Sequence, residues 1–335
     1  MKKYILNLVV VLGIFLLGAV CSYLYSANDN VEEDLGANIK SVHKSVEGSY
    51  SFLAVGHIYG APRFWAPLVD RSIRKNVFPA SSIVSFVDDI NKMGAEFMVF
   101  IGDSVMYGEE DNYFALKNTV LDELELPIFA SIGNHDVLAS DPENARSFHE
   151  KYLGEFYSSF KKDSEYFIFL DTGDSLLTSM SEDQLEFIRS EISEAKRNPE
   201  VKNVFIFTHK LVWVSESEEL EKMIYWSTSD YKNIILKGNN ISEVFPDILS
   251  LAQNKKVFWG SGDIKELYPA FYHYDKESNI TYFANSLNDS RDDLMFKVNI
   301  DKHSEVEFEL ISLFDGSKKD PLQYGEDLWT SKRGY

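Results

Sequence analysis

Short apolar runs alternate with helix-like segments along most of the chain, and this alternation constrains the fold more than any other feature of the sequence. An apolar run of about four to eight residues has the length of a buried strand, whereas apolar residues three and four positions apart mark one face of a helix. Strands that alternate with helices are typical of a layered α/β fold. The runs that we interpret as buried strands are 51–55, 97–101, 127–131, 166–170, 204–208 and 256–259.

Three segments between these runs have the periodicity of helices. Residues 81–93 place their apolar side chains on one face, and residues 244–252 predict a shorter helix. Residues 181–197 begin with Ser181 and Gln184 at the spacing of a capping box, in which each side chain bonds the other residue's backbone N–H group. We therefore expect helices at these three places.

The last third of the chain is richer in strands than in helices. Residues 282–284, 294–300 and 306–312 predict consecutive strands that form a β-rich edge or a second sheet. Before them, residues 211–240 predict a long polar connection whose aromatic side chains either line a binding site or pack the loop down. These aromatic residues are Trp213, Tyr225, Trp226 and Tyr231.

The amino-terminal segment has the pattern of an export signal or a membrane anchor. Lys2 and Lys3 precede about twenty apolar residues, which is the length of a membrane-spanning helix. Because the apolar run continues past Cys21, we expect a signal-anchor transmembrane helix at 1–26 rather than a cleaved signal peptide. Since the lysines stay in the cytoplasm, the rest of the chain is expected in the periplasm or at the cell surface, or secreted if the segment is cleaved.

The remainder of the chain is expected to form one domain. We predict a solvated linker at 27–48 and a single domain at 49–335. Cys21 is the only cysteine, so this domain contains no disulfide and no cysteine metal ligand. The formal net charge of -20 repels nucleic acid and attracts cations, so no nucleic-acid partner is expected.

Each of five predicted strands is followed at once by a residue that can bind a metal ion or a phosphate. The sequences that carry these residues are Gly56-His57-Ile-Tyr59, Gly102-Asp103, Gly133-Asn134-His135-Asp136, Thr208-His209 and Gly260-Ser-Gly-Asp263. In open α/β sheets the carboxyl ends of the strands form the edge at which ligands bind. Each sequence alone is a weak signal, but their order and spacing together predict a metal site at that edge.

With these motifs the chain resembles the calcineurin-like metallophosphoesterase superfamily, over roughly residues 50–290. The superfamily carries the motifs Asp-x-His, Gly-Asp, Gly-Asn-His-Asp/Glu, a lone His and Gly-His-x-His. The matching residues are Gly102-Asp103, Gly133-Asn134-His135-Asp136 and His209. The resemblance implies a four-layer αββα sandwich that binds two metal ions across the carboxyl edge of its sheets.

The resemblance also implies a function and a role for each matching residue. Asp103 would bridge the two metal ions, and Asn134 and His209 would bind the second ion. His135 would assist the leaving oxygen, so that His135 and Asp103 are the implied catalytic residues. The implied reaction is hydrolysis of a phosphate mono- or diester through a metal-bound hydroxide. One or two divalent or trivalent ions of manganese, iron or zinc suit these carboxylate, amide and imidazole ligands.

Two motifs depart from the superfamily pattern. His57 and Tyr59 stand where the first motif has Asp and His, and residues 260–263 contain neither histidine of the last motif. In one alignment Ser261 and Asp263 take the two histidine positions, so that His57 and Asp263 exchange roles on the first metal ion. Tyr59 is then a candidate phenolate ligand of a trivalent ion, a substrate contact or a packing residue.

A second alignment of the last motif, shifted by two residues, places Asp263 among the ligands of the second metal ion. The first ion would then keep only His57, Asp103 and Tyr59 as candidate ligands, which favours a mononuclear site. The altered motifs also leave open a catalytically inactive module that binds a partner protein or an envelope polymer. The remaining histidines, which we interpret as surface or structural residues, are His43, His149, His273 and His303.

Overall fold

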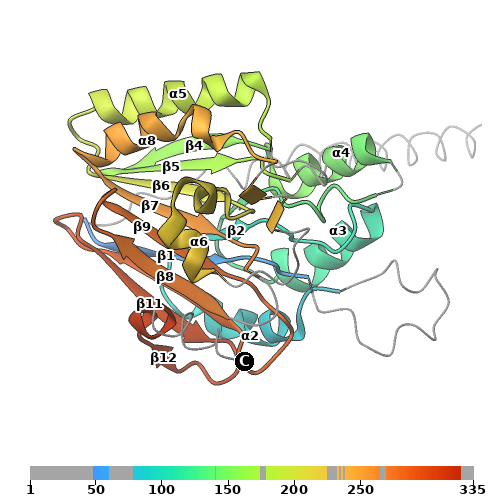
Figure 1. Cartoon of the computed structure of the whole chain (residues 1–335). Helices are drawn as coiled ribbons and strands as arrows, with labels where there is room; N and C mark the ends of the chain where they lie inside the picture. Colours follow the sequence, from blue (N-terminus) through green and yellow to red (C-terminus); the bar gives the residue numbers. More distant parts are fainter. Residues whose placement is uncertain are drawn as a thin grey trace, which may run out of the picture. The chain divides into compact units, whose positions relative to one another are not determined.

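Figure 1 shows the computed structural model of the chain, which describes residues 48–59, 78–139, 141–173, 179–224, 232–233, 235–236, 238–264 and 269–325. The chain divides into two compact units, Met1–Ser41 and Val42–Tyr335, and every described residue belongs to the second. The predicted hydrophobic helix at 1–26 and all of the linker except residue 48 lie outside the described residues. Within the described residues, no helix is long and apolar enough to cross a membrane.

The first of two six-stranded sheets has the order β12-β11-β10-β1-β2-β3. Strands β1, β2 and β3 are parallel, and β10 pairs antiparallel with the other side of β1. Strands β11 and β12 continue this antiparallel part. The strands are β1 (Tyr50–Val55), β2 (Phe97–Ile101), β3 (Ile128–Ser131), β10 (Leu294–Ile300), β11 (Val306–Ser312) and β12 (Lys318–Lys319).

The second sheet has the order β4-β5-β6-β7-β9-β8. Its four central strands, β5, β6, β7 and β9, are parallel, and an antiparallel strand closes each side. The strands are β4 (Ser158–Lys162), β5 (Glu165–Leu170), β6 (Asn203–Thr208), β7 (Lys256–Ser261), β8 (Ala270–Asp275) and β9 (Ile280–Asn285).

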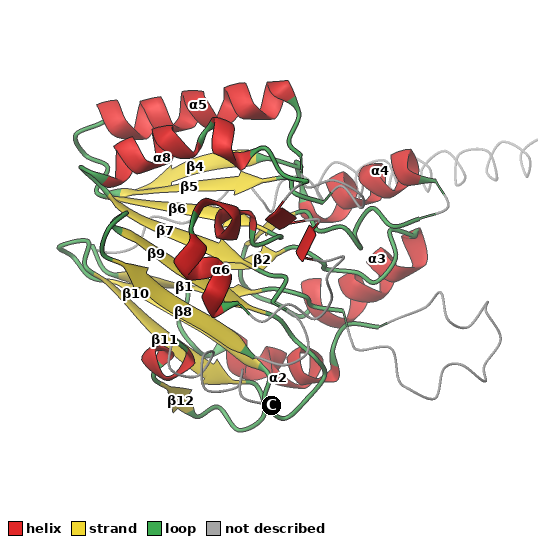
Figure 2. Ribbon diagram, viewed as in Figure 1, coloured by secondary structure: helices red, strands yellow, loops and turns green. Residues whose placement is uncertain are grey.

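Helices cover the outer faces of both sheets (Figure 2). Apolar side chains of α2, α3 and α4 pack on the first sheet, and those of α5, α6 and α8 pack on the second. This four-layer αββα arrangement confirms the predicted fold class. The helices are α2 (Ser81–Asn91), α3 (Glu110–Leu116), α4 (Pro142–Leu153), α5 (Glu182–Arg197), α6 (Glu218–Met223) and α8 (Phe245–Ala252). The shorter turns are the π-helix Lys117–Leu121 and the 3₁₀ helices Val212–Glu216, Ile241–Glu243 and Pro321–Tyr324.

The layer between the two sheets consists largely of phenylalanine. Phe52 of β1 lies 5.5 Å from Phe167 of β5 and 5.2 Å from Phe205 of β6, measured between ring centroids. Both contacts cross from one sheet to the other in edge-to-face geometry, which is favourable for aromatic rings. Further rings continue the layer, among them Phe97, Phe207, Phe283 and Phe296. The layer joins the sheets and holds their strand ends side by side.

The predicted strands are all present, with ends that differ by no more than two residues. The strands of the last third, however, do not form a sheet of their own. Strand β9 lies parallel to β7 in the second sheet, whereas β10 lies between β1 and β11 in the first. Strands β4 and β8 were not predicted, because their sequences mix polar and apolar residues.

Two local predictions were only partly right. Ser181 accepts a hydrogen bond from the Gln184 backbone N–H at 3.2 Å, but the Gln184 side chain bonds the backbone of Asp171 instead of completing a capping box. In the connection 211–240, Trp213 is buried and packs against Tyr282 at 4.8 Å between ring centroids. This aromatic residue therefore packs the segment down. Tyr225, Trp226 and Tyr231 lie outside the described residues.

Candidate metal centre

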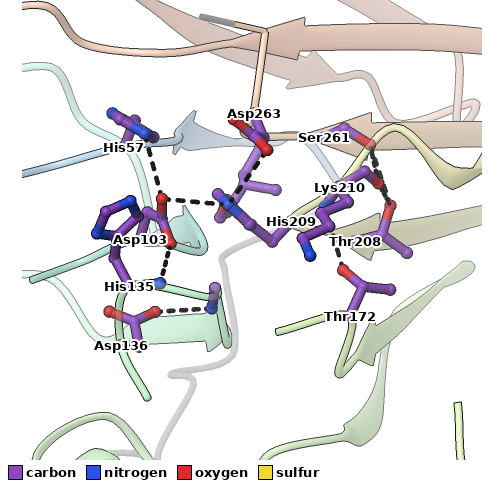
Figure 3. A network of polar contacts seen from close by, with 12 residues as sticks. His57, Asp103, His135, Asp136, Thr172, Thr208, His209, Lys210, Ser261 and Asp263 are labelled. Carbon is purple, nitrogen blue, oxygen red and sulfur yellow. Dashed lines mark hydrogen bonds and ion pairs between the residues drawn. The ribbon is translucent and has the colours of Figure 1, made fainter. Parts of the chain in front are cut away.

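The carboxyl ends of β1, β2, β3, β6 and β7 meet at one edge of the sandwich. Figure 3 shows five of the predicted site side chains together there, namely His57, Asp103, His135, His209 and Asp263. Backbone contact between the two sheets brings these ends close. A Cβ atom at Gly262 would overlap the carbonyl oxygen of Ile101, and one at Gly56 would overlap Gly262. Only glycine permits such an approach, so Gly56 and Gly262 fix the distance between the first and last motifs.

Asp103 lies at the centre of the site. It is 1% exposed, and its Oδ2 atom is 3.2 Å from Nε2 of His57 and 3.2 Å from Nε2 of His209. Its Oδ1 atom accepts a hydrogen bond from the His135 backbone N–H at 2.9 Å. Burial alone would raise the pKa of Asp103, but the two imidazoles hold it well below its usual value. The carboxylate is therefore the ionised form at neutral pH.

The turns that present these residues have unusual backbone conformations. Asp103 has a φ of 55° and His57 a φ of 59°, and Gly102 precedes Asp103 with a φ of 74°. Side chains with a Cβ seldom adopt the left-handed region, although Asp and His do so more readily than most. Such residues cluster at functional sites, where the surrounding structure compensates for the strain. The two αL residues support a functional role for this edge.

His209 has the environment of a metal ligand. It is fully buried, and its Nδ1 atom lies 3.1 Å from the Ile101 carbonyl oxygen, so Nδ1 carries the proton of the neutral ring. Nε2 then presents a lone pair and has no hydrogen-bond partner within the described residues. Asp263 lies on the same side, with Oδ2 3.9 Å from His209 Nε2. Burial would lower the pKa of His209, but Asp103 and Asp263 raise it to about 9 when no metal ion is present.

A network of hydroxyl and indole groups holds the backbone around His209. The side chains of Thr208 and Ser261 lie 3.0 Å apart, and both donate to the carbonyl oxygen of Lys210. Trp259 Nε1 donates to Thr208 Oγ1 at 3.0 Å, and Trp213 Nε1 donates to Ser261 Oγ at 2.9 Å. Ser261, which the first alignment put in a ligand position, thus belongs to this network. The sequence analysis named Trp213 as a residue that lines a site or packs its loop, but it assigned no such supporting role to Thr208 or Trp259.

The turn that contains Asn134 and His135 is held by Asp136. Its carboxylate accepts hydrogen bonds from the backbone N–H groups of Gly133 at 2.7 Å and Val105 at 3.0 Å. Burial and the charge of Asp103 raise the pKa of Asp136 to about 7. His135 places Nδ1 3.0 Å from the Met106 carbonyl oxygen, and Asn134 is half-buried beside it. Asp136 belongs to the matched motif, but the sequence did not assign it this supporting role.

Tyr59 and His57 form a bonded pair on the other side of Asp103. The Tyr59 hydroxyl is 2.8 Å from His57 Nε2, and the two ring centroids are 4.2 Å apart. The Tyr59 ring also contacts His135, at 5.0 Å between centroids. Tyr59 is 6% exposed and His57 keeps a side chain that is 14% exposed. The three aromatic side chains form the wall of the site opposite His209.

The other histidines do not join the site. His149 lies on α4, fully buried against Tyr113 and Phe156. His273 lies on β8, and His303 is exposed in a turn. These positions agree with the interpretation of His149, His273 and His303 as structural or surface residues, and His43 lies outside the described residues.

The donor atoms around Asp103 and His209 fit a metal ion in their chemistry. Nε2 of His209 faces a carboxylate oxygen of Asp103 at 3.2 Å, so either a proton on Nε2 or a bound cation must lie between these two atoms. Asp263 adds a second buried carboxylate on this side. In the described part of the chain, however, no three His, Cys, Asp or Glu side chains are already arranged to hold a metal ion. Side-chain adjustment would accompany binding.

Comparisons with known proteins identify the fold. No family model matches the sequence, and no curated protein matches it. The chain is similar to a purple acid phosphatase from yellow lupin (Lupinus luteus) seeds, with 14% identity and a TM-score of 0.54. The match covers 83% of this chain and 54% of the phosphatase, so the chain spans about half of that protein's length.

Two further solved structures are less similar. The sulfate thiohydrolase SoxB from Thermus thermophilus has 10% identity and a TM-score of 0.44, over 87% of this chain and 61% of that one. A 5'-nucleotidase from Candida albicans has 9% identity and a TM-score of 0.42, over 81% of this chain and 53% of that one. The similarity to the lupin phosphatase, over most of this chain, shows that the chain has the calcineurin-like metallophosphoesterase fold.

Proposed function

We propose that the chain is a metal-dependent hydrolase of phosphate esters that acts outside the cytoplasm. The observation that carries this proposal is the buried Asp103 carboxylate, which lies 3.2 Å from the Nε2 atoms of both His57 and His209. Buried charge partners with strongly shifted pKa values are typical of metal and catalytic sites. The fold adds support, because the lupin protein with the same fold is a phosphatase.

Four residues would hold the metal ion. Asp103, His209 and Asp263 are buried and lie on one side of the site, and Asn134 lies in the turn next to His135. Carboxylate, imidazole and amide donors suit manganese, iron or zinc. When bound, such an ion neutralises phosphate charge and lowers the pKa of a water molecule. The Ile101 carbonyl oxygen accepts a hydrogen bond from His209 Nδ1 and so orients the ring with Nε2 towards the metal ion.

His135 is the candidate for proton transfer to the leaving oxygen. Its backbone N–H donates a hydrogen bond to Asp103 Oδ1, and its Nδ1 atom forms a hydrogen bond with the Met106 carbonyl oxygen. These two contacts fix the ring and leave Nε2 as the atom that can hold or release a proton. His135 and His57 are only partly buried, whereas Asp103 and His209 are fully buried. A phosphate ester would therefore approach from the side of His135 and His57.

The location outside the cytoplasm rests on the sequence of residues 1–26. We expect the full chain in the membrane fraction, and a chain that lacks residues 1–26 in the soluble fraction. The phosphate ester, monoester or diester, is the proposed substrate in that compartment. Recovery of the full chain among soluble cytoplasmic proteins would contradict this part of the proposal.

The activity is tested with two aryl phosphates, a monoester and a diester, in the presence of manganese, zinc or iron. We expect turnover by the natural chain and a loss of at least about 10⁴-fold in Asp103→Asn, which corresponds to about 5.5 kcal/mol. Asp103→Asn preserves the side-chain shape but removes the charge on which the centre depends. Asp111→Asn, on the exposed face of α3, is the matched control and should keep full activity.

The same experiment separates the enzyme from a non-catalytic module. A natural chain that binds no ion and hydrolyses neither ester would contradict the proposal. That result would favour the alternative, in which the cleft binds a partner protein or an envelope polymer.

A further inference from the structure

The His57–Tyr59 pair lies where the first metal ion of this fold would be bound by an Asp-x-His motif. We propose that the centre holds a single metal ion, on the His209 side of Asp103, and that the His57–Tyr59 pair takes the place of the other ion. This inference rests on the proposed metal-dependent function and specifies the number of ions and the residues that set it.

The first argument concerns the nitrogen atom that a metal ion would need. An ion bound by both Asp103 and His57 must approach His57 through Nε2, because Nε2 is the ring atom that faces the Asp103 carboxylate. That atom is already in contact with the Tyr59 hydroxyl at 2.8 Å and with Asp103 Oδ2 at 3.2 Å. An imidazole nitrogen has one lone pair or one proton to share. His209 Nε2 has the same contact with Asp103, but His57 Nε2 is also engaged by the Tyr59 hydroxyl.

The second argument concerns the space beside His57. Tyr59 is buried, and its ring packs against His57 at 4.2 Å and against His135 at 5.0 Å between centroids. An isolated antiparallel β-bridge to Pro79 holds the backbone of Tyr59 in place. The side chain that replaces the second ligand of the motif thus fills the wall of the site with an aromatic ring. A phenol ring is larger than the imidazole that the motif would place there.

The third argument concerns the last motif, for which the two alignments place Asp263 on different ions. Asp263 Oδ2 lies 3.9 Å from His209 Nε2, which places this carboxylate on the side of the proposed ion. Ser261 instead accepts a hydrogen bond from Trp213 and donates to the Lys210 carbonyl. This arrangement follows the shifted alignment of the last motif. The His209 side gains a carboxylate, and the His57 side gains the Tyr59 hydroxyl.

The pair also changes what a substrate would meet. On the His209 side a phosphate oxygen would meet a metal ion, and on the other side it would meet hydrogen-bonding groups of His57, Tyr59 and His135. Of these, His57 and His135 are partly exposed. The two sides of Asp103 are therefore chemically different, in contrast to a centre with two ions.

The test is a count of metal ions. The full chain is saturated with Mn²⁺, freed of excess ion and analysed for metal content and by electron paramagnetic resonance. We expect one ion per chain and the spectrum of an isolated Mn²⁺ ion. The double variant His57→Asp/Tyr59→His restores the Asp-x-His motif and should bind two ions per chain, with the broadened spectrum of a spin-coupled pair. Aspartate tolerates the left-handed backbone at position 57, where φ is 59°.

The outcomes distinguish this inference from the proposed function. Two ions in the natural chain would overturn the single-ion inference and leave the proposed function intact, whereas no ion at all would overturn both. A folded double variant that still binds one ion would refute the role of His57 and Tyr59. If the double variant does not fold, as judged by its thermal unfolding, the count in the natural chain decides alone.

A second variant tests Tyr59 itself. Tyr59→Phe retains the ring but removes the hydroxyl that contacts His57. We expect the metal content to stay at one ion per chain. If the iron-loaded natural chain showed a tyrosinate-to-iron absorption band in the visible range that Tyr59→Phe abolished, Tyr59 would be a metal ligand and the inference would be wrong.

Discussion

The same strands build two very different regions, the phenylalanine layer between the sheets and the polar edge at their carboxyl ends. Strand β1 contributes Phe52 to the layer and leads to His57, and β6 contributes Phe205 and leads to His209. The layer consists largely of phenylalanine side chains. At the edge, the buried Asp103 carboxylate lies 3.2 Å from the Nε2 atoms of two imidazoles, those of His57 and His209.

The difference shows how the molecule divides stability from chemistry. Aromatic burial stabilises the fold, since each ring removes a large apolar area from water. Burial of charge opposes stability unless the charges are paired. The stability that the layer provides offsets the cost of the buried charges. The layer also holds the strand ends in place, so that the few residues after each strand can serve the site. Three perturbations, in order of decreasing effect, test this division.

Loss of a ring from the layer should destabilise the fold without changing the site. Phe205 contacts Phe52, Phe167 and Phe258 at 4.8 to 5.2 Å between ring centroids. Phe205→Ala should lower the free energy of unfolding by about 3–5 kcal/mol, because it creates a cavity that the rigid layer cannot fill. Denaturant unfolding measures this change, and metal affinity of the folded variant should be unchanged.

The control for the layer is Phe314→Ala. Phe314 is 59% exposed, so its removal should change stability by no more than about 0.5 kcal/mol. Equal losses from both variants, or a loss of metal affinity in Phe205→Ala, would break the proposed division between the two regions.

A titratable group away from the edge provides a second test, through pH. His149 is buried among aromatic rings on α4, and burial together with Arg146 lowers its pKa to about 3. Because the unfolded chain binds a proton at the usual pKa of 6.5 and the folded chain does not, stability falls as the pH drops from 6.5 towards 3. His149→Phe should be more stable than the natural chain at pH 5, by about 2 kcal/mol.

The comparison with pH 8 isolates the proton from the packing. There both the folded and the unfolded natural chain carry a neutral His149, so the advantage of His149→Phe seen at pH 5 should be absent. Chemical unfolding at the two pH values measures this. An equal difference at pH 5 and pH 8 would mean that packing, and not protonation, distinguishes the two chains.

The smallest effect is expected for Ser261, which supports the backbone next to the metal centre without being a proposed ligand. Ser261→Ala removes the acceptor of Trp213 and one of the two donors to the Lys210 carbonyl, which fix the backbone next to His209. Metal affinity should fall about 10-fold, as is usual for groups that orient a ligand without touching the ion. Titration with Mn²⁺ followed by calorimetry measures the affinity. Ser250→Ala, on the surface of α8, should leave it unchanged.

Much of the fold and of the site could be predicted because the signals are local. The parallel strands are short apolar runs, and residues such as Asp103 and His209 follow within two positions of a strand end. Because the carboxyl ends of parallel strands lie at one edge of a sheet, the convergence of these residues follows from sheet geometry. The position of β10 beside β1 was not predictable, since no local pattern specifies which strands become neighbours. Strands β4 and β8 were missed because polar and apolar residues are mixed in both, so neither forms an apolar run.

Within the site, the sequence failed where side chains depend on backbone turns. The contact between Tyr59 and His57 depends on the left-handed conformation of His57, which no propensity predicts. The place of Asp263 depends on the close approach of Gly262 to Ile101, a contact between two sheets. The predicted ligand roles, the metal ions and the hydrophobic helix at 1–26 stay predictions.

The two buried indoles next to His209 give the protein a built-in optical signal. Trp213 and Trp259 are both fully buried, and each donates its Nε1 proton to a hydroxyl of the residues that flank the centre. They are two of the five tryptophans of the chain. An ion that enters at His209 changes the electric field at both rings. Occupancy of the centre can therefore be followed by emission, without a label and without a substrate.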